Sequence, residues 1–426
     1  MGFVGLALAV GGLGSRLSAG LYLAVAAWLR LWLLPLPPSL SDDTLRYVWD
    51  GRVVSAGLNP YLIAPEDDGL AQLRDARWQV MPHKEVPTVY PPAALGLFAV
   101  GSRAPNPVFG IKILLTFFDW AGCLLLFRLA RRLGVPETRA VWYAWNPLVV
   151  LEVAGQGHVD GLMVACAVGA VLLLHEKKPW RAGLAAAAGV AAKLVPLVAL
   201  LPWTLTRLPD DVTRPWARSI RFAAAAGLGT AFFFAPVAVT TGLPPGLVTY
   251  GVSWEFNGPI YEPLWRGIEH LDVVDTIKGG LDRAKGAFGD RTGHEPWNRL
   301  YHFVYPQFLA KLLCAGAFGL YWLWVCSRRT SPTAAAGRVF GAVLLASATL
   351  YPWYLLWVLP WAALAAHPAW LAASALTLFA YLPQHTDIPL FPWIWAVIWI
   401  PVLCLLLRSH AWSRLDTGDP PPCPTD

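Results

Sequence analysis

Charged side chains are scarce in this sequence of 426 residues. Asp, Glu, Lys and Arg make up 14% of the chain, against about 25% in ordinary soluble domains. Apolar residues make up 56% and the mean hydropathy is +0.48. A soluble fold could not cover so much apolar surface with so few charges. The composition therefore excludes a soluble globular protein and predicts a polytopic membrane protein.

Several common site motifs are also absent. None of the six cysteines forms a close pair in the sequence, so neither a disulfide framework nor a zinc site is predicted. The sequence lacks a P-loop, a glycine-rich dinucleotide-binding pattern, H-E-x-x-H and G-x-S-x-G. No nucleotide-sugar site is therefore expected. No Lys/Arg tract with interleaved aromatic residues occurs, so the net charge of +6 does not indicate nucleic-acid binding.

Long apolar runs dominate instead, and a helix needs about 20 apolar residues to cross a membrane. The run at 181–206 carries Lys193, Pro196 and Pro202 in its middle, so it predicts two short helices in a hairpin. Residues 90–102 are too short to cross. Complete spans are expected at 17–36, 107–128, 139–154, 158–175, 219–240, 301–326, 336–351, 352–366, 368–382 and 389–407. The sequence thus predicts an all-α polytopic membrane protein with about 11–13 transmembrane helices.

Lys and Arg are concentrated in short loops, which the positive-inside rule assigns to the cytoplasm. This assignment leaves both termini in the cytoplasm of a multi-pass protein. It puts two long polar segments, 37–89 and 241–300, outside as a first and a second outer loop. We expect residues 1–407 to form one transmembrane domain. Residues 408–426 are expected to form a disordered cytoplasmic tail, because this segment is rich in proline.

Some of the ionisable residues inside predicted spans are informative. We expect Asp119 and Glu152 to face the interior of the helix bundle, because charged groups are costly against lipid. Arg30 lies near the outer end of the first span. Its side chain either snorkels to the membrane surface or pairs with a carboxylate or a phosphate.

The first outer loop predicts a helix of about four turns. Ser41 is a good N-cap, Asp42 and Asp43 would occupy the first turn, and the turn Gly-Leu-Asn-Pro-Tyr at 57–61 would end the helix. Apolar residues at 45–54 favour a helix that lies along the membrane surface.

A stripe of charge runs along this predicted helix. Asp43, Arg46 and Asp50 are spaced i, i+3, i+7, so their side chains share one side. A carboxylate there could deprotonate a sugar hydroxyl while a cation holds a phosphate leaving group. The spacing also allows a structural explanation, in which the carboxylates complement the helix dipole and Arg46 pairs with Asp43 or Asp50.

The first outer loop resembles that of the GT-C superfamily of membrane glycosyltransferases. The segments SDDTLRYVWDGRV, GLNPY and TVYPP are similar to those of mannosyltransferases that use polyprenyl-phosphate mannose. The resemblance implies that an acidic residue of this loop is the essential carboxylate. Asp43, four residues before Tyr47, matches that position, and Asp42 is the alternative. Asn59 matches the G-x-N-P-Y turn and Tyr90 the Y-P-P segment.

A second group of residues is expected at the donor phosphate. The turn GQGHVDGL at 155–162 carries His158 and Asp160, and the resemblance supports a donor-site role for it. A turn that satisfies its own backbone through Asp160 is the alternative. An unpaired lysine in hydrocarbon costs about 2.5–3.5 kcal/mol, so Lys193 either faces a lipid phosphate or snorkels. Arg46, Arg52 and Tyr90 complete the expected donor phosphate and lipid site.

Aromatic segments in the second half of the chain suggest a sugar or acceptor site. Residues 250–265 combine aromatic rings with Glu255 and Asn257, and residues 351–357 contribute Trp353 and Tyr354. Rings can stack on sugars while carboxylates and amides bind hydroxyl groups, so we expect these residues to act with Asp160 and Asn59. Aromatic belts that anchor a protein at the membrane interface are the alternative.

These patterns together predict an inverting glycosyltransferase of the cytoplasmic membrane with its catalytic site on the outer face. The donor would be a polyprenyl-phosphate sugar, first of all mannose, and the acceptor a glycolipid or polysaccharide. Glucose or arabinofuranose as the sugar stays an alternative, as does a lipid-linked sugar flippase or transporter. No cofactor and no metal are expected, although Asp42 and Asp43 together could hold a divalent ion.

Overall fold

The computed structural model describes residues 18–206, 215–328 and 330–417. These residues form helices and turns, with no strand beyond isolated bridges that join Phe256 and Asn257 to Thr349. Four helical units in the described ranges are long and apolar enough to cross a membrane: α6 (Pro107–Leu133), α12 (Pro215–Thr240), α17 (Pro306–Arg328) and η6–α21 (Leu390–Arg408). The predicted all-α polytopic fold is confirmed.

Shorter helices account for the other predicted spans. Three such spans are interrupted, because prolines and a π-helix break them into pieces. The uninterrupted ones are α2 (Ala19–Leu33), α9 (Asp160–His175) and α18 (Pro332–Ala346), while α10 (Pro179–Ala192) belongs to the predicted hairpin. The interrupted ones are α7 (Thr138–Ala144), α8 (Pro147–Val150) and η3 (Leu151–Gly155); η4 (Pro352–Trp357) and α19 (Leu359–Ala365); and α20 (Pro368–Leu376) and η5 (Thr377–Gln384).

Several of these helices begin with the same pair of residues. A Ser or Asn caps the first turn and a proline follows at N1 in α6, α8 and α18. The side chains of Asn106, Asn146 and Ser331 accept hydrogen bonds from backbone N–H groups that have no partner inside the helix. The N-cap pattern therefore fixes where the membrane helices start.

The predicted hairpin at 181–206 is confirmed. Helix α10 ends at Lys193, and α11 (Leu197–Leu205) runs back from it. Gly183 near the start of α10 packs on Phe222, and Thr206 after α11 accepts a hydrogen bond from Arg218 at 3.3 Å. Because residues 218 and 222 are one turn apart on α12, the two ends of the hairpin lie together. Lys193 stands at its apex.

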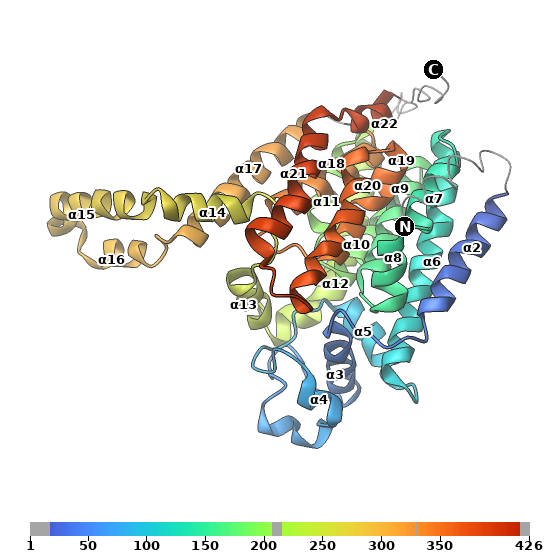
Figure 1. Cartoon of the computed structure of the whole chain (residues 1–426), viewed down its shortest axis with the longest axis horizontal. Helices are drawn as coiled ribbons and strands as arrows, with labels where there is room; N and C mark the ends of the chain where they lie inside the picture. The colour runs from blue at the N-terminus through green and yellow to red at the C-terminus, as the bar shows by residue number, and fades with distance from the viewer. Residues whose placement is uncertain (1–17, 207–214, 329, 418–426) are drawn as a thin grey trace.

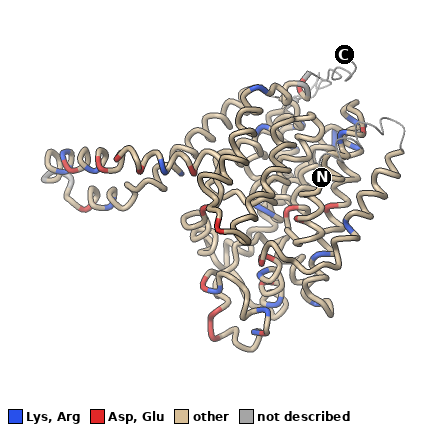
Figure 2. The backbone as a smooth tube through the Cα atoms, in the orientation of Figure 1, with Lys and Arg blue, Asp and Glu red and all other residues tan. Residues whose placement is uncertain are grey.

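The two predicted outer loops are helical as well. The first loop (37–89) contains α3 (Asp43–Ser55), η2 (Asp68–Leu73) and α4 (Ala76–Val80), and α5 (Pro92–Gly101) follows it. It lies at the end of the bundle away from the C-terminus (Figure 1). The second loop (241–300) contains α13 (Pro245–Ser253), α14 (Tyr261–His270), α15 (Val273–Thr292) and α16 (Glu295–Tyr301). Charged residues line the first loop and the α15–α16 segment (Figure 2).

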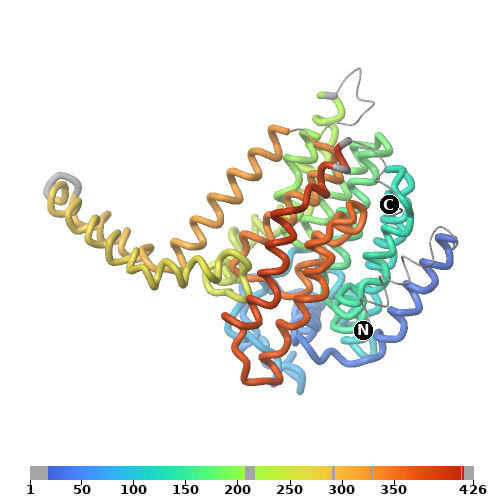
Figure 3. The backbone as a smooth tube through the Cα atoms, turned by 45° about the horizontal axis from the view of Figure 1, so that its top comes forward, coloured from blue at the N-terminus to red at the C-terminus, as the bar shows by residue number. Residues whose placement is uncertain are grey.

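Helices α14 to α16 form an arm that extends sideways from the bundle. Both views show α15 and α16 lying beside each other at the far end of this arm (Figures 1 and 3). Helix α14 joins the arm to the bundle, since Tyr261 and Ile268 pack against Ala310 and Cys314 of α17. The predicted span at 301–326 therefore starts five residues late, at Pro306, because residues 295–301 belong to the arm.

Helix α3 differs from its prediction in two respects. Asp42, not Ser41, is the N-cap residue, and its own side chain makes no capping bond, while Ser41 Oγ accepts from Asp43 N at 3.3 Å. The apolar residues do not face a membrane surface: Tyr47 and Val48 pack into the main core, and Trp49 and Val53 pack under residues 58–81. The contact with α5 is especially close, because a Cβ on Gly51 would lie 2.3 Å from the carbonyl oxygen of Phe98.

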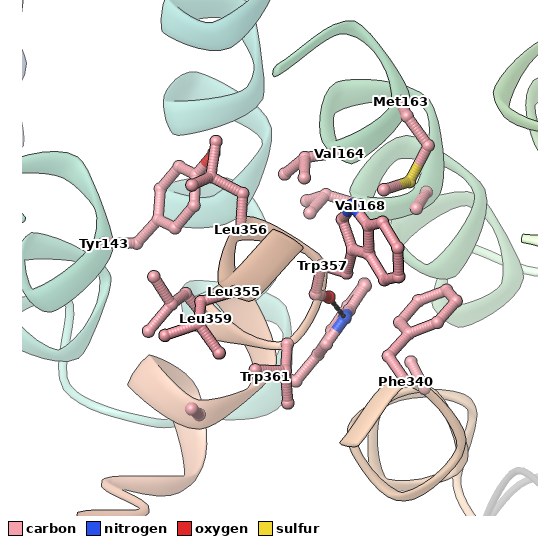
Figure 4. Close-up of a cluster of buried hydrophobic side chains, with 14 of the residues drawn as sticks. Tyr143, Met163, Val164, Val168, Phe340, Leu355, Leu356, Trp357, Leu359 and Trp361 are labelled. Carbon is pink, nitrogen blue, oxygen red and sulfur yellow. Dashed lines mark hydrogen bonds between the residues drawn. The ribbon is translucent and has the colours of Figure 1, made fainter. Parts of the chain in front are cut away.

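A cluster of buried hydrophobic side chains lies where α7, α9, α18 and the η4–α19 segment meet (Figure 4). Trp357 and Trp361 lie between Phe340 of α18 and the valines of α9, and Trp361 donates a hydrogen bond to the carbonyl of Trp357 at 2.9 Å. Large aromatic side chains contribute much of the buried apolar area in such a core. This packing holds the residues of η4 in place.

The C-terminal segment is partly ordered. Residues 411–413 form η7 and α22 runs from Arg414 to Thr417. Asp416 forms an ion pair with Arg338 at 2.6 Å, and the ring of Trp412 lies directly against Gly337. The predicted disordered tail therefore cannot begin at 408. Residues 418–426 of that prediction lie outside the described residues.

A buried ion pair fastens α2 to the bundle. Arg30 Nε lies 2.7 Å from Asp119 Oδ2, and both side chains are at most 1% exposed. Tyr143 donates to the other oxygen of Asp119 at 2.8 Å, and Arg30 donates to the carbonyl of Ala144 at 2.8 Å. Asp119 and Glu152 face the interior, as predicted. Of the alternatives for Arg30, pairing with a carboxylate is the one found.

We expect Asp119→Ala to destabilise the protein by about 3–5 kcal/mol, because the substitution leaves Arg30 buried without its counter-charge. The thermal unfolding midpoint in detergent measures the effect. The double variant Arg30→Met with Asp119→Leu is the control, and it should recover most of the loss. A single variant as stable as the wild type would contradict the prediction.

Candidate active site

A cavity of about 420 Å³ lies between the first loop, the α10–α11 break, the second loop and the η4 segment. Its walls come from widely separated parts of the chain. Residues 40–47 and 82–91 form one side, residues 192–195 lie at the α10–α11 break, and residues 247–256 and 351–357 supply aromatic rings. Tyr381 and Gln384 complete the lining. The predicted residues Asp42, Asp43, Arg46, Tyr90, Lys193, Trp353 and Tyr354 all line it.

Asp43 is the carboxylate best placed for proton transfer. It is half-buried in the cavity wall, and the hydroxyl of Tyr47 donates to its Oδ2 at 3.5 Å. Burial raises the pKa of Asp43 to about 6; nearby Lys193 lowers this pKa, and Asp160 and Asp42 raise it. A carboxylate with a pKa this close to neutrality is a better base than an ordinary one. Asp42 also lines the cavity but is exposed.

Lys193 and Asp160 form an ion pair in the cavity wall. Lys193 Nζ lies 2.7 Å from Asp160 Oδ1, which also accepts a hydrogen bond from Trp357 Nε1 at 2.5 Å. The ammonium lies over the rings of Tyr354 and Trp357, at 4.5 Å and 5.1 Å from their centres. Asp160 Oδ2 is buried and has no hydrogen-bond partner in the described part of the chain. Asp160 itself is fully buried and does not line the cavity, so it is not in the predicted position to bind a sugar and instead holds Lys193.

The helix termini favour both charges of this pair. Asp160 is the first residue of α9, where the helix dipole stabilises a negative charge. Lys193 caps the C-terminus of α10, where the dipole stabilises a positive charge. In the sequence, Asp160 and Lys193 each lie where an apolar run is interrupted, and these interruptions put them at helix ends.

His158 does not reach the cavity. Its side chain is fully buried behind Trp353, and the two rings stack at 3.8 Å. His158 Nε2 lies 3.5 Å from Glu152 Oε2, and Glu152 accepts a hydrogen bond from Tyr381 at 2.8 Å. His158 thus supports the wall that Trp353 and Tyr381 line, and it is not in a position to contact a phosphate.

The two arginines predicted at the phosphate are engaged elsewhere. Arg46 donates to Asp50 at 3.0 Å and to the carbonyls of His83 and Val86 at 2.9 Å and 2.7 Å. These bonds occupy all three guanidinium nitrogens, so Arg46 holds the loop at 82–87. Arg52 pairs with Asp75 at 2.7 Å and does not line the cavity.

Three residues predicted at the acceptor have structural contacts instead. Asn59 donates to Thr241 at 3.0 Å, which joins the first loop to the end of α12. Asn257 is buried with a positive φ of 53° and accepts from Trp399 at 3.0 Å. Glu255 pairs with Lys311 at 3.0 Å. None of these three lines the cavity.

Other cavity residues were not selected from the sequence. The cavity is also lined by Tyr250 of α13, Trp254 just after that helix, Trp357 and Tyr381. The hydroxyls of Tyr250 and Tyr354 share a hydrogen bond. Tyr250 and Trp254 lie at the N-terminal end of the aromatic segment that drew attention to Glu255 and Asn257. Tyr250 and Trp254 are four residues apart, a spacing that puts two side chains on one face of a helix, and this spacing could have predicted that they act together.

A narrow apolar cleft of about 230 Å³ adjoins the cavity. The two share Val89, Tyr90, Pro91, Leu194 and Leu247. Its remaining walls come from the end of α12 and the turn after it, including Phe234, Val237, Ala238 and Leu243. A cavity with charged groups therefore lies beside a cleft that suits a hydrocarbon chain.

No group of three or more His, Cys, Asp or Glu side chains close enough to hold a metal ion occurs among residues 18–206, 215–328 and 330–417. Asp42 and Asp43 adjoin at the cavity wall without a third such ligand. The groups of the described cavity that can act on a substrate are its carboxylates, its lysine and its aromatic rings.

Comparison with known proteins assigns the class of this site. Residues 1–207 match the model of the family described as "Alpha-(1->6)-mannopyranosyltransferase, N-terminal domain". The chain is 26% identical over 425 residues to alpha-(1->6)-mannopyranosyltransferase A of Mycobacterium tuberculosis, covering 95% of this chain and 78% of that protein. It is 24% identical to a Mycolicibacterium smegmatis protein named "Probable alpha-(1->6)-mannopyranosyltransferase", over 91% of this chain and 74% of that one.

The chain is a membrane glycosyltransferase. Its similarity to mannosyltransferases confirms the resemblance found in its first loop, and it sets aside the alternative of a lipid-linked sugar flippase. The match to the family model spans α3, the turn around His158 and the α10–α11 break. The glycosyltransferase therefore has a sugar donor and an acceptor as its substrates.

We expect the activity of this glycosyltransferase to fall on acidification, with a half-point near pH 6 in kcat/KM. A base must be deprotonated, so activity is lost as the pH drops through the pKa of Asp43, which is about 6 and not 3.8. In Lys193→Gln the half-point should move to higher pH, since the ammonium lowers this pKa. A wild-type profile flat from pH 5 to pH 8, or a Lys193→Gln half-point moved to lower pH, would contradict this.

Proposed function

We propose that this glycosyltransferase transfers mannose from a polyprenyl-phosphate donor to a glycolipid or polysaccharide acceptor. The single observation that carries the proposal is that the cavity and the apolar cleft lie side by side. A cavity lined by Asp43 and Lys193 shares a wall with the apolar cleft at the end of α12. A donor with a charged sugar-phosphate head and an isoprenoid tail matches both spaces. The names of the relatives support mannose and an α-(1→6) linkage.

Asp43 acts in this proposal as the base of a single inverting displacement. Its carboxylate takes the proton of an acceptor hydroxyl, and the hydroxyl oxygen forms a bond to C1 of mannose. The bond between C1 and the phosphate oxygen breaks, and its electron pair leaves with the polyprenyl phosphate. Lys193 stabilises the developing charge on that phosphate. Asp160 holds the ammonium of Lys193 in place for this step.

The aromatic side of the cavity is the proposed acceptor site. Trp254 lies beside His83, with ring centres 4.6 Å apart, where the second loop faces the first. Tyr250, Tyr354 and Trp353 line the wall between this entrance and Lys193. Exposed ring faces and edges bind sugar rings with little loss of conformational freedom, which suits a carbohydrate acceptor.

The proposed orientation has the site on the outer face of the cytoplasmic membrane and both termini in the cytoplasm. The distribution of Lys and Arg over the short loops supports it. A single catalytic domain at 1–407 is supported by the cavity lining, which runs from Leu40 to Gln384. No metal takes part in the proposed step, so EDTA should leave the rate unchanged.

The proposal is tested with purified enzyme, radiolabelled polyprenyl-phosphate mannose and a lipid extract of the host. Wild type should transfer label to a new product, and Asp43→Asn should lower the rate by about 10²–10⁴-fold, because an amide cannot take the proton. Asp42→Asn is the matched control and should keep most of the activity, since the Asp42 side chain is exposed.

If Asp43→Asn kept near-normal turnover and Asp42→Asn lost it, Asp42 and not Asp43 would be the base. Faster transfer from polyprenyl-phosphate glucose than from the mannose donor would overturn the choice of sugar. Radiolabelled donor recovered intact after incubation with wild type and every lipid fraction would refute a lipid acceptor.

We expect Ala238→Trp to weaken binding of a long-chain donor. The indole would fill the cleft and displace about two CH₂ groups of the tail, each worth about 0.8 kcal/mol, which corresponds to roughly a tenfold rise in KM. A donor with a chain too short to enter the cleft should be unaffected. Val239→Trp, one residue along and outside the cleft, is the control. Equal effects of the two substitutions would show that the tail lies elsewhere.

A further inference from the structure

At the N-terminal end of α3, which carries Asp43, the N-cap residue makes no capping bond with its own side chain. Ser41 Oγ accepts from Asp43 N at 3.3 Å, and Gln384 donates to the carbonyl of Leu40 at 3.3 Å. Three further bonds come from one residue of another segment, Gln156. The side-chain oxygen of Gln156 accepts hydrogen bonds from the backbone N–H groups of Ser39 and Leu40, both at 2.9 Å. The backbone oxygen of Gln156 accepts from the hydroxyl of Thr44 at 2.6 Å. One residue thus holds the chain on both sides of Asp42 and Asp43.

The turn that contains Gln156 packs closely against the start of α3 and against α6. Gly157, the next residue, has a φ of +80°, and a Cβ there would lie 3.2 Å from Thr44 Oγ1 and 2.9 Å from Lys112 Cγ. Lys112 in turn donates to the carbonyl of Leu36, three residues before Ser39. The linker from α2 to α3 is therefore anchored along its length. A small shift of Gln156 would move the start of α3 directly.

The position of Gln156 is set by the π-helix η3. Gln156 N donates to the carbonyl of Leu151 at 2.8 Å, a bond that spans five residues where an α-helix spans four. Four residues after Gln156 the chain reaches Asp160, the partner of Lys193. The same short turn therefore carries one wall of the site and fixes the start of α3, which carries the opposite one.

We propose that Gln156 is a positioning residue that holds Asp43 in register with the Asp160–Lys193 pair. Gln156 itself is 3% exposed and does not line the cavity, so it acts through Asp43 and not by touching a substrate. The inference rests on the proposed function of Asp43 as the base. A base displaced by about 1 Å can lose roughly 10²-fold in rate.

The test is Gln156→Met, which keeps the size of the side chain and removes the oxygen that Ser39 and Leu40 share. We expect kcat to fall about 10–100-fold with the KM of the donor changed less than about threefold. Gln156→Glu keeps an acceptor oxygen in the same place and should restore kcat to within about threefold of wild type. Thr44→Val removes the other bond to Gln156 and should repeat the loss if the methionine variant fails to fold.

A double substitution separates positioning from a general loss of structure. In an Asp43→Asn background there is no base to misplace, so Gln156→Met should cause no further loss in kcat. An equal loss in both backgrounds would overturn the inference, and so would a Gln156→Met variant with wild-type kcat. If Asp43→Asn alone keeps wild-type turnover, the proposed function of Asp43 fails. If Asp43→Asn is inactive and Gln156→Met is normal, only the positioning role fails.

Discussion

The neutralisation of Lys193 is the constraint on which the site depends. A lysine in the middle of an apolar run would be costly against lipid, and here a carboxylate and two aromatic faces surround it. To meet Asp160, α10 must end where α9 begins. The chain therefore reverses at Lys193, and the reversal leaves open the space that the first loop closes. The Lys193–Asp160 pair therefore both neutralises the lysine and sets the shape of the cavity.

The other charges of the bundle follow the same principle. Arg30 and Asp119 join α2, α6 and α7, and Glu152 reaches Tyr381 across the bundle. Each contact links elements that are far apart in the chain, so each buried charge also specifies which helices are neighbours. Aromatic rings also link elements that are far apart in the chain. Four rings stack in one column from the second loop to the turn after the π-helix: Phe256, Tyr351, Trp353 and His158.

Much of the fold was predictable because apolar runs and prolines carry local information. The spans and the break at Lys193 follow from residues that are adjacent in the sequence, and so does the placement of Asp43 on a helix before Gly57. The pairing of Arg46 with Asp50 was one of the alternatives that the spacing offered, and it is found. The other partners of Arg46 and the partner of Arg52 were not predictable, since the carbonyls of residues 83 and 86 and Asp75 reach them only in the folded chain. Cationic residues near a phosphate site look alike in sequence whether they bind a ligand or a loop.

The cavity draws its walls from residue 40 to residue 384, which has a consequence for biosynthesis. A ribosome that has released α3, α9 and α10 into the membrane has made every charged group of the site. The rings of Tyr354, Trp357 and Tyr381 that enclose Lys193 and Asp43 emerge only near the end of translation. A nascent or truncated chain therefore exposes its base and its lysine without the enclosure that excludes water. Such a chain would have no closed site in which to hold a sugar donor.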